Sequence, residues 1–298
     1  MKKIHGWKDW LVAVRPWSFP ASAMPVAVTL VYLWWLGERV DWLNGVWALL
    51  DIIVFHAAGN TWSDYFDYRR GVDRKGAFCV DTLTSGRFQP REIFGLSAGL
   101  LAVALAGGAG LAWRSGELLW YIGVGGMLCL LLYPALKYRA LGDVVIFLAY
   151  ALLPVLGTAY VATGTVDWEV LAVGVPVGCI TVAILHANNM RDMQTDRQAG
   201  IRTLAMVLGG RVSAVLYCLE VLFPFAWVAG CVVAGNLPVW SLLAVLGVGI
   251  AWKESRRAAR YPFSPASGIV GMDEATAKLQ LLFSSLLMVS FVLARLFS

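Results

Sequence analysis

Nine apolar segments, each of about the length of a membrane span, follow one another along the chain. They cover residues 17–36, 45–63, 92–112, 118–136, 142–162, 168–188, 212–233, 237–252 and 278–296. A helix that crosses the bilayer needs about 20 mostly apolar residues. Only 14% of the 298 residues are charged, whereas soluble domains contain about 25% charged residues. We therefore expect an all-α, polytopic transmembrane bundle of about nine helices.

The basic residues are concentrated in alternate loops between these segments. All but three of the 24 Lys and Arg residues lie on one side of the predicted spans, and the exceptions are Arg39, Arg114 and Arg295. Because Lys and Arg are enriched in cytoplasmic loops, the N-terminus is predicted to be cytoplasmic. The formal charge of +5 is therefore explained by the basic residues of these loops. No soluble basic domain is present that would indicate a nucleic-acid partner.

The two long loops on the predicted cytoplasmic side are the expected location of function. They cover about residues 64–91 and 189–211, whereas the turns on the other side are short. Loops on a rigid scaffold carry function more often than the scaffold itself. We expect a single membrane-embedded domain over residues 1–298, with active-site loops at about 60–91 and 186–211. No obligate protein partner is evident, and we expect a bacterial inner membrane.

Both long loops open with a similar acidic motif. The first motif reads NTWSDYFDYRRGVD and the second reads NNMRDMQTDRQAG. Asn60 and Asp64 have the same spacing as Asn188 and Asp192. Internal duplication of this kind is common in membrane folds, and it predicts two pseudo-repeated halves.

On an α-helix, each motif places its polar side chains on one face. Three side chains of the first motif fall within about 60° of one another: Asn60, Asp64 and Asp67. Three of the second fall within about 80°: Asn188, Asp192 and Asp196. Four carboxylates close together repel one another, so a cation is expected between them.

The residue types in the two motifs favour a magnesium–diphosphate site. Oxygen ligands without Cys or clustered His are typical of Mg²⁺, which binds one or two carboxylates together with substrate phosphates. Basic residues lie among or near the acids: Arg69, Arg70, Arg74, Lys75, Lys137, Arg191 and Arg197. Acids that bind metal next to bases that bind phosphate oxygens are what a diphosphate site requires. Either motif alone is also compatible with a solvated, capped helix end.

Several segments resemble the UbiA superfamily of intramembrane prenyltransferases. They are NTWSDYFDYRRGVD, LKYRALGD, LGTAYVATG and HANNMRDMQTDRQAGIRTLAMVLG. With the opening RPWSFPASAMPV, they are most similar to the menaquinone branch, the 1,4-dihydroxy-2-naphthoate polyprenyltransferases and their vertebrate menaquinone-forming relative. The resemblance extends to about Gly209. It implies a UbiA-like bundle with Mg²⁺ as cofactor, and a prenyl diphosphate and an aromatic compound as substrates.

The resemblance also implies roles for individual residues. The expected Mg²⁺ ligands are Asp64, Asp67, Asp192 and Asp196, and the expected catalytic residues are Lys137, Arg197, Asp67 and Asp192. Further substrate contacts are expected from Asn60, Ser63, Asn188, Asn189, Arg191, Arg74, Tyr133 and Tyr65. Aromatic walls for an allylic cation would come from Trp62, Tyr65, Tyr68 and Tyr133. Two residues depart from the family pattern: Ser63 replaces the usual Asn, and Asp81 replaces a common basic residue.

Polar residues inside the apolar segments have two interpretations. They are either packed and hydrogen-bonded within the bundle or functional, and they are Asp51, His56, His186 and Glu220.

Two other classes of membrane protein compete with a prenyltransferase. A cation-coupled transporter would place its acids near the bilayer midplane, whereas these acids lie at predicted helix ends. A CDP-alcohol phosphotransferase would contain a D-G-x-x-A-R run, which neither motif has. Among acceptors, 1,4-dihydroxy-2-naphthoate is expected first, with homogentisate, 4-hydroxybenzoate and a lipid alcohol as alternatives.

Overall fold

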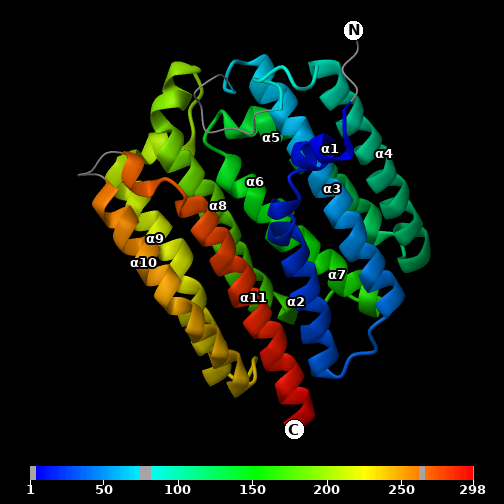
Figure 1. The fold of residues 1–298 in the computed structure, drawn as a ribbon. Helices are drawn as coiled ribbons and strands as arrows, with labels where there is room; N and C mark the ends of the chain where they lie inside the picture. Colours follow the sequence, from blue (N-terminus) through cyan, green and yellow to red (C-terminus); the bar gives the residue numbers. More distant parts are fainter. Residues whose placement is uncertain (1–4, 74–81, 262–265, 298) are drawn as a thin grey trace.

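The computed structural model describes residues 5–73, 82–261 and 266–297, and within them it contains helices and no β-strand (Figure 1). The α-helices are α1 (Trp7–Val14), α2 (Pro20–Leu36), α3 (Trp42–Arg69), α4 (Pro90–Ser115), α5 (Leu118–Lys137), α6 (Gly142–Phe147), α7 (Leu153–Thr163), α8 (Leu171–Gln198), α9 (Leu204–Val233), α10 (Val248–Arg260) and α11 (Met272–Phe297). The predicted all-helical fold is confirmed.

The helices match the predicted spans closely. Seven are long and apolar enough to cross a membrane, and the pair formed by α1 and α2, bent by 52°, gives an eighth. The predicted segment 237–252 is divided between a 3₁₀ helix, Val239–Gly247, and α10, which follows it directly. The N-terminus lies at one end of the bundle and the C-terminus at the opposite end (Figure 1). The chain is an integral membrane protein.

Helix α8 is the most deeply buried of the candidate spans. In its most apolar stretch 72% of the residues are buried, compared with 17–44% in the other candidate helices. Its apolar side chains cover all faces, as expected for a helix surrounded by others. Gly178 lets α8 approach Ala151 so closely that a Cβ at this position would overlap the Ala151 methyl group. The acidic motif at the end of α8 therefore stands on a rigid support.

The predicted span 142–162 is irregular in the middle. A π-helical turn, Leu148–Leu152, separates α6 from α7, and Pro154 follows it without an N–H to donate. Such turns redirect side chains and are frequent at functional sites. Here Tyr150 in the π turn meets His56 of α3 edge to face, with ring centroids 4.9 Å apart.

Helices α3 and α8 end in the same way. Each has 28 residues, and each is followed by a glycine of positive φ, Gly71 at 73° and Gly200 at 71°. The carbonyl of Asp67 accepts a bond from the N–H of Val72 at 2.9 Å, and that of Asp196 accepts from Ile201 at 3.1 Å. Both are glycine-assisted helix caps. The internal repeat therefore includes the helix end as well as the acids.

Candidate active site

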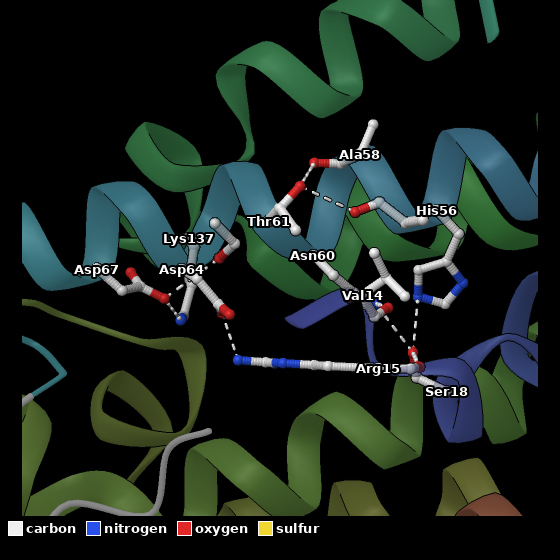
Figure 2. A network of polar contacts seen from close by, with 12 residues as sticks. Val14, Arg15, Ser18, His56, Ala58, Asn60, Thr61, Asp64, Asp67 and Lys137 are labelled. Atoms are coloured by element: carbon white, nitrogen blue, oxygen red, sulfur yellow. Dashed lines mark hydrogen bonds and ion pairs between the residues drawn. The ribbon is translucent and has the colours of Figure 1, made fainter. Parts of the chain in front are cut away.

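Two buried acids of α3 each meet a cation from another part of the chain (Figure 2). Asp64 and Asp67 are 4% and 6% exposed. Asp64 forms an ion pair with Arg15, which lies between α1 and α2. Asp67 accepts a hydrogen bond from the Lys137 amino group at 3.1 Å and one from the Tyr138 hydroxyl at 2.5 Å. The first motif is thus a polar centre, not a solvated helix end.

Arg15 reaches this centre through an unusual backbone conformation. Its φ is +56°, in the left-handed region that a non-glycine residue rarely adopts. Pro16 follows and disfavours the right-handed helical conformation for the residue before it. Asn60 fixes the turn, because its amide donates to the Val14 carbonyl and to the Ser18 hydroxyl, both at 3.0 Å. Backbone strain of this kind is often kept at functional sites.

Sequence reasoning did not place Arg15 in the site. Arg15 and Asp64 are 49 residues apart, and the opening RPWSFPASAMPV indicates only the family resemblance. One feature of the sequence could have pointed to Arg15: it is an arginine directly before a proline, at the predicted cytoplasmic end of the first span.

In the prenyl transfer that the family resemblance implies, replacing Arg15 with glutamine is expected to lower the rate about 10- to 100-fold, since a hydrogen bond to a charged group contributes roughly 1.5–3 kcal/mol. The KM for the implied prenyl diphosphate should rise, because Arg15 would be free to bond a phosphate once Asp64 bound a metal ion. Steady-state kinetics on the purified variant measure both values. Arg39→Gln, an exposed substitution at the opposite end of the bundle, is the matched control. Unchanged kinetics in Arg15→Gln would remove Arg15 from the site.

The acids of the second motif approach the same centre. Asp196 is 6% exposed and interacts electrostatically with Lys137, Asp192 and Asp67. Lys137 at the end of α5 therefore lies within reach of acids from both α3 and α8. Three of the four sequence-predicted ligands, Asp64, Asp67 and Asp196, interact with Lys137. The fourth, Asp192, is paired with Arg191.

Arg191 has a different environment from the one expected for a substrate contact. Its guanidinium donates to both carboxylate oxygens of Asp192, at 2.8 and 2.7 Å, and to Asp273 of α11 at 2.7 Å. A fork-shaped pairing of this kind fixes the geometry of a carboxylate. Arg191 thus holds Asp192 and ties α8 to α11.

Of the remaining predicted contacts, Ser63 and Tyr133 interact with Asp67, whereas Tyr65 packs against α4. Ser63 donates to Asp67 at 3.2 Å, and Tyr133 interacts electrostatically with Lys137 and Asp67. Tyr65 packs on Phe94 of α4, with ring centroids 5.1 Å apart.

On α8, Asn189 is buried, Asn188 is half-buried and Arg197 is exposed. Near Tyr65, the Trp62 ring also packs on Phe94, and Tyr68 is exposed. Arg74, Lys75 and Asp81 lie outside the described residues.

His56 and Asp51 have packed environments. The two ring nitrogens of His56 face the hydroxyls of Ser22 at 2.8 Å and Ser18 at 3.4 Å. Asp51 lies against Gly107 of α4, where a Cβ would overlap its carboxylate. For these two residues the structure favours the packed interpretation.

Asp73, just beyond the end of α3, shares the electrostatic field of the site. Burial and the nearby Asp67 and Asp64 carboxylates raise its pKa from 3.8 to about 7. The folded protein therefore binds a proton that the unfolded chain has lost between these two pH values. The stability of the metal-free protein should fall as pH rises from about 4 to about 7.

Asp73→Asn is expected to flatten this pH dependence. The variant carries no titrating group at this position, so it should unfold at a higher temperature than the wild type above about pH 7, and at a similar temperature near pH 4. Thermal unfolding across this pH range in the presence of a chelator measures the difference. If the unfolding temperatures of the two proteins change with pH in parallel, the raised pKa of Asp73 is contradicted.

A cavity of about 490 Å³ opens next to the ends of α3, α5 and α8. It is lined by Arg70, Ala135, Tyr138, Arg139, Ala199, Gly200 and Ile201. The Arg70 guanidinium lies over the Tyr138 ring, 4.8 Å from its centre. The cavity thus carries positive charge and adjoins Tyr138, which bonds Asp67.

The sequence profile of the UbiA prenyltransferase family matches residues 22–268. The chain belongs to this family. The expected UbiA membership is confirmed, and a UbiA family protein is a prenyltransferase by its family's description.

Animal proteins of the UbiA family match nearly the whole chain. "UbiA prenyltransferase domain-containing protein 1" from Danio rerio is 34% identical, covering 96% of this chain and 84% of its own. The Gallus gallus protein of the same name is 31% identical, over 97% and 87%. These relatives identify the UbiA family without singling out the 1,4-dihydroxy-2-naphthoate branch, and a bacterial inner membrane stays a prediction.

Solved UbiA structures share the fold of this chain. The apo structure of a UbiA homolog from Aeropyrum pernix K1 superposes with a TM-score of 0.68 at 15% identity, covering 93% of this chain and 96% of that one. A homolog from Archaeoglobus fulgidus bound to GPP and Mg²⁺ superposes with a TM-score of 0.57 at 15% identity, over 94% and 99%.

Proposed function

We propose that this UbiA family protein transfers a polyprenyl group from a prenyl diphosphate to 1,4-dihydroxy-2-naphthoate, in a Mg²⁺-dependent step of menaquinone biosynthesis. The observation that carries the proposal is the convergence of acids from α3 and α8 on Lys137. The Archaeoglobus homolog, bound to GPP and Mg²⁺ in one structure and to DMAPP and Mg²⁺ in another, supports it. In this proposal residues 1–298 form one catalytic domain.

The residues at this centre fit Mg²⁺. Carboxylates are the ligands that this ion prefers, and a buried group of them needs positive charge nearby. Arg15 and Lys137 supply that charge to the metal-free acids. The residues that would hold Mg²⁺ are Asp64, Asp67, Asp192 and Asp196. Bound Mg²⁺ would neutralise charge on the diphosphate leaving group.

The chain's own residues would position and stabilise the diphosphate. Lys137 and Arg15 would donate hydrogen bonds to phosphate oxygens once metal binding releases them from the acids. Their positive charge stabilises the diphosphate as the allylic C–O bond breaks and its electron pair moves to the leaving oxygen. Arg191 would keep Asp192 in place throughout.

The allylic cation then meets the aromatic acceptor. The electron-rich ring forms the new C–C bond, and loss of a proton or of CO₂ from that ring restores its aromaticity. Tyr133, which interacts electrostatically with Lys137 and Asp67, would shelter the cation with its ring. A bundle embedded in lipid excludes the water that would quench the cation.

The orientation follows from the same proposal. The N-terminus and the acidic ends of α3 and α8 lie at one end of the bundle (Figure 1). The excess of Lys and Arg at this end favours a cytoplasmic location. A soluble acceptor would enter there, and the polyprenyl tail would extend sideways into the bilayer.

The acceptor is tested by mass spectrometry of products. Purified protein in lipid is given Mg²⁺, geranylgeranyl diphosphate and one of four acceptors: 1,4-dihydroxy-2-naphthoate, homogentisate, 4-hydroxybenzoate or a lipid alcohol. We expect a prenylated, decarboxylated naphthoquinol. Product with another acceptor alone would keep the prenyl transfer and replace the proposed pathway.

A further inference from the structure

Three ionisable side chains meet inside the bundle, apart from the acidic motifs. Asp143 opens α6, His186 lies on α8 and Glu220 lies on α9, and their ligand atoms are all within 4.8 Å of one another. His186 Nδ1 is 3.1 Å from Asp143 Oδ1 and 4.0 Å from Glu220 Oε1. His186 is fully buried, and Asp143 is 5% exposed.

The cluster contains polar atoms with no protein partner. The second carboxylate oxygens, Asp143 Oδ2 and Glu220 Oε2, are buried and accept no hydrogen bond from the described residues. Leaving such atoms unpaired in an apolar interior is costly. Two carboxylates and a neutral imidazole carry a charge of −2, which one divalent cation would cancel. The cluster therefore has the composition of a neutral metal site.

The cluster adjoins the proposed diphosphate site, since Tyr133 interacts electrostatically with Asp143 as well as with Lys137 and Asp67, but it uses different ligands. On α8, His186 lies about 120° around the helix from Asp192, so the two residues lie on different faces of the helix. Lys137 and Arg15 bond acids of α3 and neither bonds this cluster. Apart from His186, the ion pairs of the described residues bring no Lys or Arg to its carboxylates, so the charge is balanced by protons or by a bound cation.

The ligand set indicates which ion would bind. Imidazole nitrogen favours Zn²⁺-like transition ions over Mg²⁺, and carboxylate oxygens are compatible with them. Three protein ligands of these types are typical of zinc sites that keep an open position. The bond from each ligand to Zn²⁺ is about 2.0–2.2 Å, which in a tetrahedral site puts ligand atoms about 3.4 Å apart. The pair of His186 and Asp143 is already close to that spacing, and Glu220 would move closer on binding.

We propose that Asp143, His186 and Glu220 bind a divalent transition-metal ion of the Zn²⁺ type between α6, α8 and α9. The ion would join the helix that carries the second acidic motif to its neighbours. Its ligands would be distinct from those of the proposed diphosphate site, and loss of the ion should lower the stability of the fold more than the rate of prenyl transfer.

Metal content of the purified full-length protein tests this proposal. Protein stripped with a chelator is incubated with Zn²⁺ in the presence of excess Mg²⁺, which keeps the diphosphate site occupied, and bound zinc is measured after gel filtration. We expect one equivalent in the wild type and in Asp192→Asn. Binding should weaken at least about tenfold in Glu220→Gln and His186→Gln. Loss of a residue that only holds a metal ligand in place already lowers affinity roughly 10- to 100-fold, and these two residues are proposed as ligands themselves.

Three results would overturn the proposal. They are a wild type that retains no zinc, equal zinc in the wild type and both cluster variants, and zinc lost only in Asp192→Asn. Should a cluster variant fail to fold, the visible spectrum of Co²⁺-loaded wild-type protein decides. Intense bands of a low-coordinate site with a nitrogen ligand support it, and the weak spectrum of hydrated Co²⁺ rejects it.

Discussion

Replacing Asp64 or Asp192 with alanine should lower Mg²⁺-dependent prenyl transfer by about 1,000-fold or more, which corresponds to about 4 kcal/mol in the activation free energy. In the proposed site, each substitution would remove one Mg²⁺ ligand from one motif. The loss should be similar in size for the two variants, because the proposed reaction uses both motifs. Initial rates of product formation in lipid nanodiscs measure it.

The control for these variants is Asp41→Ala. Asp41 is exposed at the opposite end of α3, where its side chain accepts a bond from the Asn44 N–H at 3.0 Å. Loss of this cap should cost about 1 kcal/mol of stability and leave the rate unchanged. Gel filtration and thermal unfolding confirm that all the variants fold. Near-normal rates in both Asp64→Ala and Asp192→Ala would contradict the site assignment.

Lys137→Met should have the second largest effect, a loss of about 100-fold or more in rate. It removes a cation that interacts with acids of both motifs. In the proposed reaction this charge would stabilise the leaving diphosphate, an effect worth several kcal/mol in sites of this kind. Lys137→Arg keeps the positive charge and should retain more activity than Lys137→Met.

A second readout separates charge from packing at Lys137. Without Mg²⁺ the Lys137→Met variant leaves Asp67 without its ion pair, so it should unfold at a lower temperature than the wild type. Mg²⁺ should raise the unfolding temperature of the variant more than that of the wild type, because the metal replaces the missing charge. Lys253→Met, an exposed substitution on α10, is the control. An identical response to Mg²⁺ in all three proteins would contradict this role.

Helical periodicity predicted the parts of the site that lie within one helix. Asp64 and Asp67 share a face because of their spacing, and the structure places both on the buried side of α3. Helical spacing likewise put Asp196 on the face of the second motif, and Asp196 is buried on α8. Local chemistry also fixes the helix ends, since Gly71 and Gly200 follow the motifs at the same distance from Asp67 and Asp196.

Contacts between segments that are far apart in the sequence could not be predicted from spacing patterns. Arg15 meets Asp64 only because the chain turns sharply before Pro16, and no periodicity encodes that turn. Arg191 was expected to bind substrate, but Asp273 comes from a helix near the other end of the chain and completes its pairing with Asp192. The meeting of Asp143, His186 and Glu220 likewise depends on how three helices pack. Long-range packing decides which charges pair.

In the proposed reaction, this UbiA family protein breaks a prenyl diphosphate and gives the prenyl group to an aromatic ring. The most direct measurement counts both products of one reaction, with geranylgeranyl diphosphate and 1,4-dihydroxy-2-naphthoate supplied to purified protein in lipid. We predict one diphosphate released for each prenylated product, with both abolished by chelation of Mg²⁺. Diphosphate release without any prenylated acceptor, or the absence of both products with Mg²⁺ present, would contradict the account.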